Sequence, residues 1–170
     1  MKFPKTYTKK GDCVNVIIET PYKSRNKFDY DKESSLFKFS KVIPTGMEFP
    51  CEMGFIRHTK GEDGDPLDAL VLMDELTYPG CLVESRLLGV IKATQQEKGK
   101  KEERNDRFIL VPANMKEYDH LQSVSDLNKS KVQAITCFFE NYNKAEEKIF
   151  KLIEVAGAKE AHKLIKKSKV

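Results

Sequence analysis

The chain has 170 residues, of which 39% are hydrophobic and 33% are charged, and its formal net charge is +4 at pH 7. This length and composition predict one globular domain over residues 1–170 with a substantial apolar core. The 30 basic residues are interspersed with 26 acidic ones, so the charge alone does not indicate a nucleic-acid-binding protein, and no apolar run is long enough to span a membrane.

The first quarter of the chain predicts three strands. A run rich in Val and Ile at residues 13–20 predicts a strand that ends before a proline. After a loop at residues 22–26, a second extended segment begins at Lys27 and a hairpin tip follows at residues 31–35. The alternation of apolar and polar residues at 36–39 then predicts the third strand.

The stretch Glu-Asp-Gly-Asp-Pro-Leu-Asp at residues 62–68 carries the strongest chemical signal. Gly and Pro predict a stiff turn, and the apolar run at 69–73 predicts a buried strand directly after it. Asp63, Asp65 and Asp68 therefore cannot spread apart easily, and their mutual repulsion favours a bound cation. Carboxylate oxygens are hard ligands, so Mg²⁺, Mn²⁺ or Ca²⁺ is expected rather than a metal that prefers thiolates.

Two other interpretations apply to a stretch of this kind. An isolated Asp-x-Asp turn is most often a solvated loop. An EF-hand is excluded, because no Glu stands at the twelfth position and a hydrophobic strand begins where further ligands should follow.

The second half of the chain predicts a turn and one or two strands at residues 79–91, a charge-dense hairpin at residues 95–107, and two helices. Ser125 or Asp126 is the expected N-cap of the first helix. The second helix is expected to open at Gly157 and Ala158. The apolar residues of the first helix recur at helical spacing and are expected in the core: Leu127, Val132, Ile135, Phe139 and Tyr142.

The four cysteines indicate the compartment. Cys13, Cys51, Cys81 and Cys137 are far apart and form no Cys-x-x-Cys pair, so we expect reduced thiols in apolar sites. The N-terminus lacks the apolar region of a secretory leader. A cytoplasmic location is therefore expected.

The pattern D-G-D-P-L-D-A leading into a strand resembles the signature of the family I soluble inorganic pyrophosphatases. The resemblance covers the chain from about Val14 to Ala161. It includes matches to the family's V-x-I-E-x-P, Y-P-x-N-Y-G-Y-I, P-G-x-x-x-x-x-R-x-x-G-V and F-F-x-x-Y-K segments. It implies an α+β, mainly β fold, which is a five-stranded OB-like closed barrel flanked by two α-helices, with the site in the barrel mouth.

The resemblance also implies an activity, which is Mg²⁺-dependent hydrolysis of inorganic pyrophosphate to two orthophosphates by a metal-activated water, with Mn²⁺ as a substitute metal. Asp65 would be the catalytic residue, and a homo-oligomer, with a hexamer favoured, is expected. No nucleic acid or membrane partner is expected. The implied phosphate-binding residues are Lys27, Lys41, Arg107 and Tyr142, and the implied metal ligands are Asp63, Asp68, Asp65, Glu19, Asp29 and Asn105.

The chain departs from the family pattern at several positions. Asp29 and Arg107 are mild changes from Glu and Lys, and Lys144 could replace the missing cation at position 143. Strand alternation should send Asn105 and Arg107 to one face and Asp106 to the other, unless a bulge turns Asp106 inward. The larger changes replace an Arg, two Tyr, two Asp and a Lys: Lys41, Phe49, Met53, Gln95, Asn105 and Asn143.

Three alternatives to pyrophosphate hydrolysis remain open at this stage. Phe49 and Met53 make one wall more apolar, which would suit a larger phosphoanhydride such as a nucleotide or polyphosphate. Several lost ligands together could instead leave a weakly active or inactive protein. An OB-type nucleic-acid-binding module is the least favoured, because no ladder of aromatic and basic residues is present and the acidic turn repels a phosphate backbone.

Overall fold

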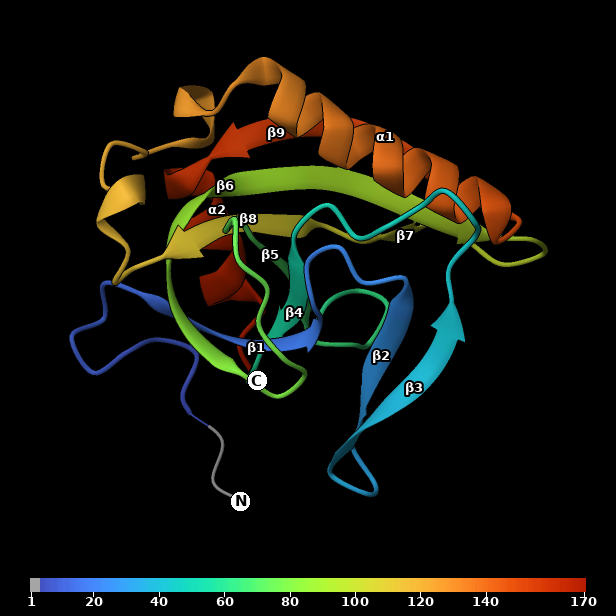
Figure 1. Cartoon of the computed structure of the whole chain (residues 1–170), viewed down its shortest axis with the longest axis horizontal. Coiled ribbons are helices and arrows are strands. Elements are labelled where there is room, and N and C mark those ends of the chain that lie inside the picture. The colour runs from blue at the N-terminus through green and yellow to red at the C-terminus, as the bar shows by residue number, and fades with distance from the viewer. Residues whose placement is uncertain (1–3) are drawn as a thin grey trace.

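The computed structural model describes residues 4–170, and its centre is a closed ring of five strands (Figure 1). Strands pair in the order β1, β4, β5, β8 and β6, and β6 pairs back with β1. All these pairs are antiparallel except β5 with β8. The ring confirms the expected barrel, and its strands are β1 (Val14–Thr20), β4 (Glu52–Ile56), β5 (Leu67–Val71), β6 (Leu82–Glu97) and β8 (Arg107–Pro112).

Both faces of the ring are apolar, because its strands are buried inside and outside. Alternate residues of every ring strand, such as Val16, Ala69 and Phe108, meet inside the ring, where Ala161 and Ile165 of α2 (Ala158–Lys167) join them. The residues between them point outward and pack under α1 (Lys129–Ala145) in a second cluster. The ring therefore fills itself with side chains on its inner face and presents its outer face to other elements.

The β2–β3 hairpin forms a sheet of its own beside the ring (Figure 1). It consists of β2 (Asn26–Asp31) and β3 (Leu36–Val42), as the sequence predicted. The hydroxyl of Thr20 on β1 accepts from the Phe28 N–H and donates to the Phe28 carbonyl, at 3.0 Å in both cases. Side chains thus attach the hairpin to the end of β1.

The helix α1 begins later than predicted. Asn128 is its N-cap and accepts a hydrogen bond from the Ser130 N–H at 3.0 Å. Asp126 instead accepts from the backbone N–H groups of Gln122 and Ser123, which closes the short 3₁₀ turn η2 (Val124–Asp126). Because this turn uses Asp126 for its own N–H groups, the prediction of Ser125 or Asp126 as the cap of α1 was wrong. Another 3₁₀ turn, η1 (Lys116–Tyr118), precedes it.

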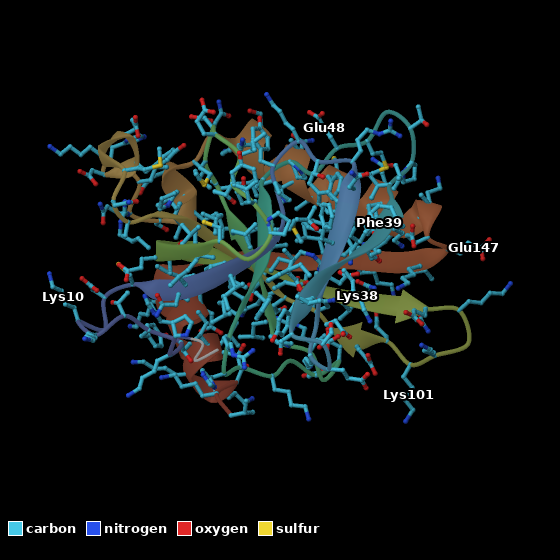
Figure 2. The ribbon with its side chains drawn as sticks, turned by 60° about the horizontal axis from the view of Figure 1, so that its bottom comes forward. Lys10, Lys38, Phe39, Glu48, Lys101 and Glu147 are labelled. Carbon is cyan, nitrogen blue, oxygen red and sulfur yellow. The ribbon has the colours of Figure 1, made fainter. Side chains whose placement is uncertain are left out.

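Strand β9 (Lys148–Gly157) was not predicted. It pairs antiparallel with the second half of β6 and leads directly into α2, whose N-cap is Gly157, as expected. Strand β7 (Glu103–Arg104) pairs with β6 from the other side of the charged hairpin. Figure 2 shows Lys101 pointing away from the body of the molecule at this hairpin. Within residues 4–170, no helix has the length and apolar character needed to cross a membrane.

We expect Gly54→Ala to destabilise the protein. A Cβ at Gly54 would lie 2.2 Å from the backbone oxygen of Ile17, so the β1–β4 pair would have to shift. Overpacking of this kind costs about 1–3 kcal/mol, which thermal unfolding would record as a melting temperature several degrees lower. Gly157→Ala is the control, because its Cβ would only touch the Ser123 hydroxyl at 3.4 Å. Equal melting temperatures for the two variants would contradict the close approach of β1 and β4.

Candidate active site

A cavity of about 450 Å³ lies against the outer face of the ring, between the β2–β3 hairpin and the end of α1. Asp68 and Leu70 share one face of β5, and Leu70 packs under α1, so the site is on the outside of the barrel and the expected position in its mouth needs correction. The structure brings together every residue that the sequence assigned to the chemistry: Glu19, Lys27, Asp29, Lys41, Asp63, Asp65, Asp68, Asn105, Arg107 and Tyr142.

The acidic turn is held by its own backbone. Gly64 has a φ of 88°, which suits glycine, and the Gly61 N–H donates to the Asp65 carbonyl at 2.7 Å. The Asp63 carboxylate accepts from the Asp65 N–H at 3.0 Å. Strand β5 begins at Leu67, earlier than the apolar run indicated, so Asp68 lies in the wall of the ring.

Burial raises the pKa values of three carboxyl groups of the cavity, most strongly those of Glu19 and Asp68. Burial raises the pKa of Glu19 to about 7, although the Tyr30 N–H donates to its Oε1 at 2.7 Å. Burial also raises the pKa of Asp68 to about 6, against the opposing effect of Arg107. Desolvation raises the pKa of Asp63 too, although the hydrogen bond from the Asp65 N–H lowers it. These are carboxyl groups whose ionised forms lack enough compensating charge.

Asp65 differs from these groups because it is exposed. Its carboxylate lies 3.5 Å from the Lys32 ammonium at the tip of the β2–β3 hairpin. Both side chains are mostly solvated, so this contact contributes little stability. Water therefore reaches the Asp65 carboxylate freely, unlike the buried carboxyl groups of Glu19 and Asp68.

The lysines expected to bind phosphate already have acidic partners. Lys27 forms an ion pair with Asp29, and Lys41 forms one with Glu146 at the end of α1. The Lys41 ammonium also lies 5.6 Å from the centre of the Tyr142 ring. Each of these two lysines is neutralised by one carboxylate, which an incoming anion would have to displace.

Arg107 is buried without a carboxylate partner among the described residues. It is 4% exposed, and its guanidinium lies 4.2 Å from the centre of the Phe139 ring and 5.1 Å from that of Phe150. One terminal nitrogen donates to the Asn105 carbonyl at 2.8 Å and the other to Gln95 Oε1 at 3.4 Å. Its Nε atom has no partner within residues 4–170. Burial lowers the pKa of Arg107.

The alternation predicted at residues 105–107 agrees with the structure. Asn105 and Arg107 line the cavity, whereas Asp106 does not. Asp106 accepts from the Ala93 N–H at 3.1 Å and forms an ion pair with Arg104. The bulge that would turn Asp106 into the cavity is absent from this part of the described chain.

The replaced positions have mostly apolar or structural roles. Phe49 is 2% exposed and packs on the rings of Phe138 and Tyr142 at 5.3 and 6.2 Å. Asn143 is buried and donates to the Phe139 carbonyl at 2.8 Å. Lys144 is exposed and outside the cavity, so the idea that it compensates for Asn143 was wrong.

Lys148, which the sequence analysis did not single out, lines the cavity from the first position of β9. Only a prediction of this strand would have indicated that Lys148 faces the cavity. Lys32 and Glu146 also line the cavity and were missed. Lys32 lies in the turn of the β2–β3 hairpin and Glu146 directly follows α1, so neither position belongs to a periodic sequence pattern.

The cavity suits a hard divalent cation by its donor chemistry. Six acidic and five cationic side chains line it, the oxygen donors are hard ligands, and burial raises the pKa values of Glu19 and Asp68. Within residues 4–170, no three acidic, His or Cys side chains are gathered in advance as a metal-binding group. The acidic residues therefore fit a metal chemically, and they have to exchange backbone and lysine partners to hold one.

Comparisons with known proteins cover nearly the whole chain. The family model for inorganic pyrophosphatase matches residues 16–170. An inorganic pyrophosphatase from Halalkalibacterium halodurans is 36% identical over 152 residues, covering 89% of this chain and 90% of the relative. One from Synechocystis sp. is 33% identical over 144 residues, covering 85% and 82%. The crystal structure of inorganic pyrophosphatase from Thermus thermophilus is similar in fold, with a TM-score of 0.87, 32% identity, and coverage of 97% of this chain and 93% of that chain.

We expect the stability of the metal-free protein to fall as pH rises from about 5 to about 7.5. The pKa of Glu19 is raised from 4.5 to about 7 on folding, so the folded state binds more protons than the unfolded state. This stabilising contribution is complete below the unfolded pKa and is lost as pH rises through the folded pKa. Thermal unfolding in EDTA would measure the loss.

Glu19→Gln is the control for this pH dependence, because its amide does not titrate. The variant should show a smaller decline in melting temperature over the same range, and added divalent cation should raise the melting temperature of the wild type most at the higher pH. An identical decline in both proteins would contradict the buried, charge-deficient environment of Glu19.

Proposed function

The chain belongs to the inorganic pyrophosphatase family, and from this premise we propose that it hydrolyses inorganic pyrophosphate to two orthophosphates in the cavity between the ring, the hairpin and α1. The observation that carries this assignment is that all ten residues implied by the resemblance line that one cavity. The cavity offers both carboxylates and cationic side chains, which are the two kinds of group that the reaction needs.

The acidic side chains would hold the metal. Pyrophosphate is a polyanion that repels carboxylates and anionic nucleophiles, and a bound divalent cation would supply positive charge and lower the pKa of water there. Mg²⁺ is the proposed metal, with Mn²⁺ as a substitute, because the donors are hard oxygens. The proposed ligands are Glu19, Asp29, Asp63, Asp65 and Asp68, which all line the cavity.

Asp65 would take the proton of the attacking water. Its carboxylate is exposed to solvent and close to Asp63 in the same turn. Asp68 and Glu19 are less solvated, so they are better placed to hold a cation than to exchange protons with water. This proposal gives the acids of one turn different tasks according to their exposure.

Lys27, Lys41, Arg107 and Tyr142 would bind the phosphate oxygens. Lys27 and Lys41 would release Asp29 and Glu146, respectively, when a phosphate takes their place. Release of Asp29 would also free that carboxylate for the cation, so binding of metal and substrate would support each other.

Asn105 is the exception among the implied metal ligands. Its neutral amide lies next to the buried Arg107, whose positive charge disfavours a second cation there. Asn105 therefore fits the anion rather than the metal.

A larger phosphoanhydride is the weaker alternative. It rested on an apolar wall formed by Phe49 and Met53, and both line the cavity. Phe49 is fixed there by an aromatic cluster with Phe138 and Tyr142. Pyrophosphate remains the substrate that the cavity supports best.

Location and assembly are part of the same proposal. A cytoplasmic location is supported by Cys13, Cys51, Cys81 and Cys137, which are all free thiols. A homo-oligomer, with a hexamer favoured, is supported by the apolar side chains that β9 exposes, including Ile149 and Ile153, each more than half exposed.

We expect the purified protein to release phosphate from pyrophosphate in the presence of Mg²⁺, and EDTA to stop the release. Asp65→Asn should lower the rate by at least about 100-fold, because the amide cannot accept a proton. A colorimetric phosphate assay measures both. Asp119→Asn is the matched control, since Asp119 is exposed and far from the cavity lining. If wild type and Asp65→Asn release phosphate equally slowly, the enzymatic assignment is wrong.

The expected assembly has a mass of about six times 19.5 kDa. Light scattering coupled to size-exclusion chromatography would measure it directly. Ile153→Lys should shift the mass toward smaller species, because a charged side chain would enter the apolar surface of β9. A wild-type protein that elutes as a monomer at all concentrations would refute the hexamer.

A further inference from the structure

The charge that faces the cavity changes from one strand to the next. Asp68 on β5 is opposite Arg107 on β8, and β8 pairs in turn with β6, which carries Gln95. β6 then pairs with β9, where Lys148 is opposite Glu97. Across these strands the cavity side chains pass from an acid to a buried cation, then to a neutral amide, and finally to a second cation.

The positive charge of Lys148 is only partly offset by its ion pair. Its ammonium lies 2.8 Å from Glu97, and the same carboxylate also pairs with Lys100. These contacts, Lys100 first and then Lys148, hold the pKa of Glu97 at about 2, so one negative charge is shared by two ammonium groups. Lys27 and Lys41 each have a carboxylate of their own. The surplus positive charge therefore lies on the β6–β9 side.

Arg107 adds a second cation at this side. Asp68 on the paired strand attracts it electrostatically, but among the described residues no carboxylate forms an ion pair with it. A buried guanidinium without an anion is costly, because protein replaces the water that would solvate it. Its contacts are two aromatic rings, the Asn105 carbonyl and a long hydrogen bond to Gln95, and within residues 4–170 its Nε atom has no partner. An anion beside Arg107 would supply the direct ion pair and the acceptor that its Nε atom lacks.

The remaining side chains at this wall do not suit a metal ion. Gln95 and Asn105 are neutral, and the Asn105 Nδ2 group donates to Gln95 Oε1 at 3.4 Å. Gln95 Oε1 also accepts from Arg107, so the oxygen that could face a metal is turned toward a guanidinium. The metal that the family resemblance implies at these two positions therefore does not fit the residues present.

We propose that Gln95, Asn105, Arg107 and Lys148 form a metal-free subsite for one phosphoryl group of the substrate, in which Lys148 supplies the cation that Asn143 lacks. The proposal deepens the proposed function and rests on it for the identity of the substrate. Asn143 is buried and bonded to its own helix, whereas Lys148 reaches the same cavity from the neighbouring strand. Metal ions are confined to the acidic side of the cavity.

The first test measures binding of inorganic phosphate in EDTA by isothermal titration calorimetry. Wild type should bind phosphate without any metal. Lys148→Met should weaken binding about tenfold, as expected for a lost charge-assisted contact, and Lys148→Arg should retain most of it. Lys144→Met is the matched control, because Lys144 lies in the last turn of α1 and outside the cavity, and it should bind like wild type.

The second test counts bound Mn²⁺ by electron paramagnetic resonance. The double variant Gln95→Asp, Asn105→Asp should bind one more Mn²⁺ per chain than wild type, because it restores carboxylates at the neutral wall. Thermal unfolding of each variant verifies that it is folded. Equal Mn²⁺ counts, a phosphate affinity that needs metal, or normal phosphate binding by Lys148→Met would each overturn the subsite.

Failure of this inference differs from failure of the proposed function. If wild type does not hydrolyse pyrophosphate but Lys148→Met loses phosphate binding, the subsite stands and the enzymatic assignment falls. If wild type is active and Lys148→Met binds phosphate normally in EDTA, the enzymatic assignment stands and the subsite is wrong.

Discussion

The site depends on carboxyl groups that the fold buries without forming an ion pair with a cationic side chain of residues 4–170. Glu19 on β1 and Asp68 on β5 lie on either side of β4 in the ring, and burial raises their pKa values to about 7 and 6. A protein that only had to fold would gain by replacing them with apolar residues. The ring instead keeps a site that is incomplete until cations and a polyanion enter together, which couples ligand binding to the charge state of the fold.

The closed ring tolerates this arrangement, because the packing that stabilises the fold and the side chains of the cavity lie on different faces of the strands. The inner face contains only apolar packing from every ring strand and from α2, while the outer face carries both the packing under α1 and the functional side chains. Neighbouring residues of one strand therefore serve different purposes: Ala69 fills the interior and Asp68 faces the cavity. Substitutions at the cavity, such as Gln95 and Asn105, can accumulate without disturbing the interior packing.

Sequence patterns predicted the parts in which local chemistry and tertiary structure agree. The acidic turn and the strands that alternate clearly could be placed, and with the family resemblance so could the barrel. Strand β9 could not, since most of its residues are exposed, it pairs along one edge only, and a register shift at Lys92 and Ala93 interrupts its pattern. The start of α1 was misjudged because Asp126 had two possible sets of backbone donors. The position of Lys148 follows from β9, so one missed strand also concealed a side chain of the site.

The β2–β3 hairpin is hydrogen-bonded as a separate sheet, and the ring closes without it. Its attachment to β1 depends on a few side-chain contacts, such as those of Thr20, and Lys32 near its tip reaches the acidic turn. Insertions, deletions or exchanges in this hairpin would therefore leave the barrel intact while reshaping one wall of the cavity. Variation in this segment gives evolution a means to change the pocket at little risk to folding.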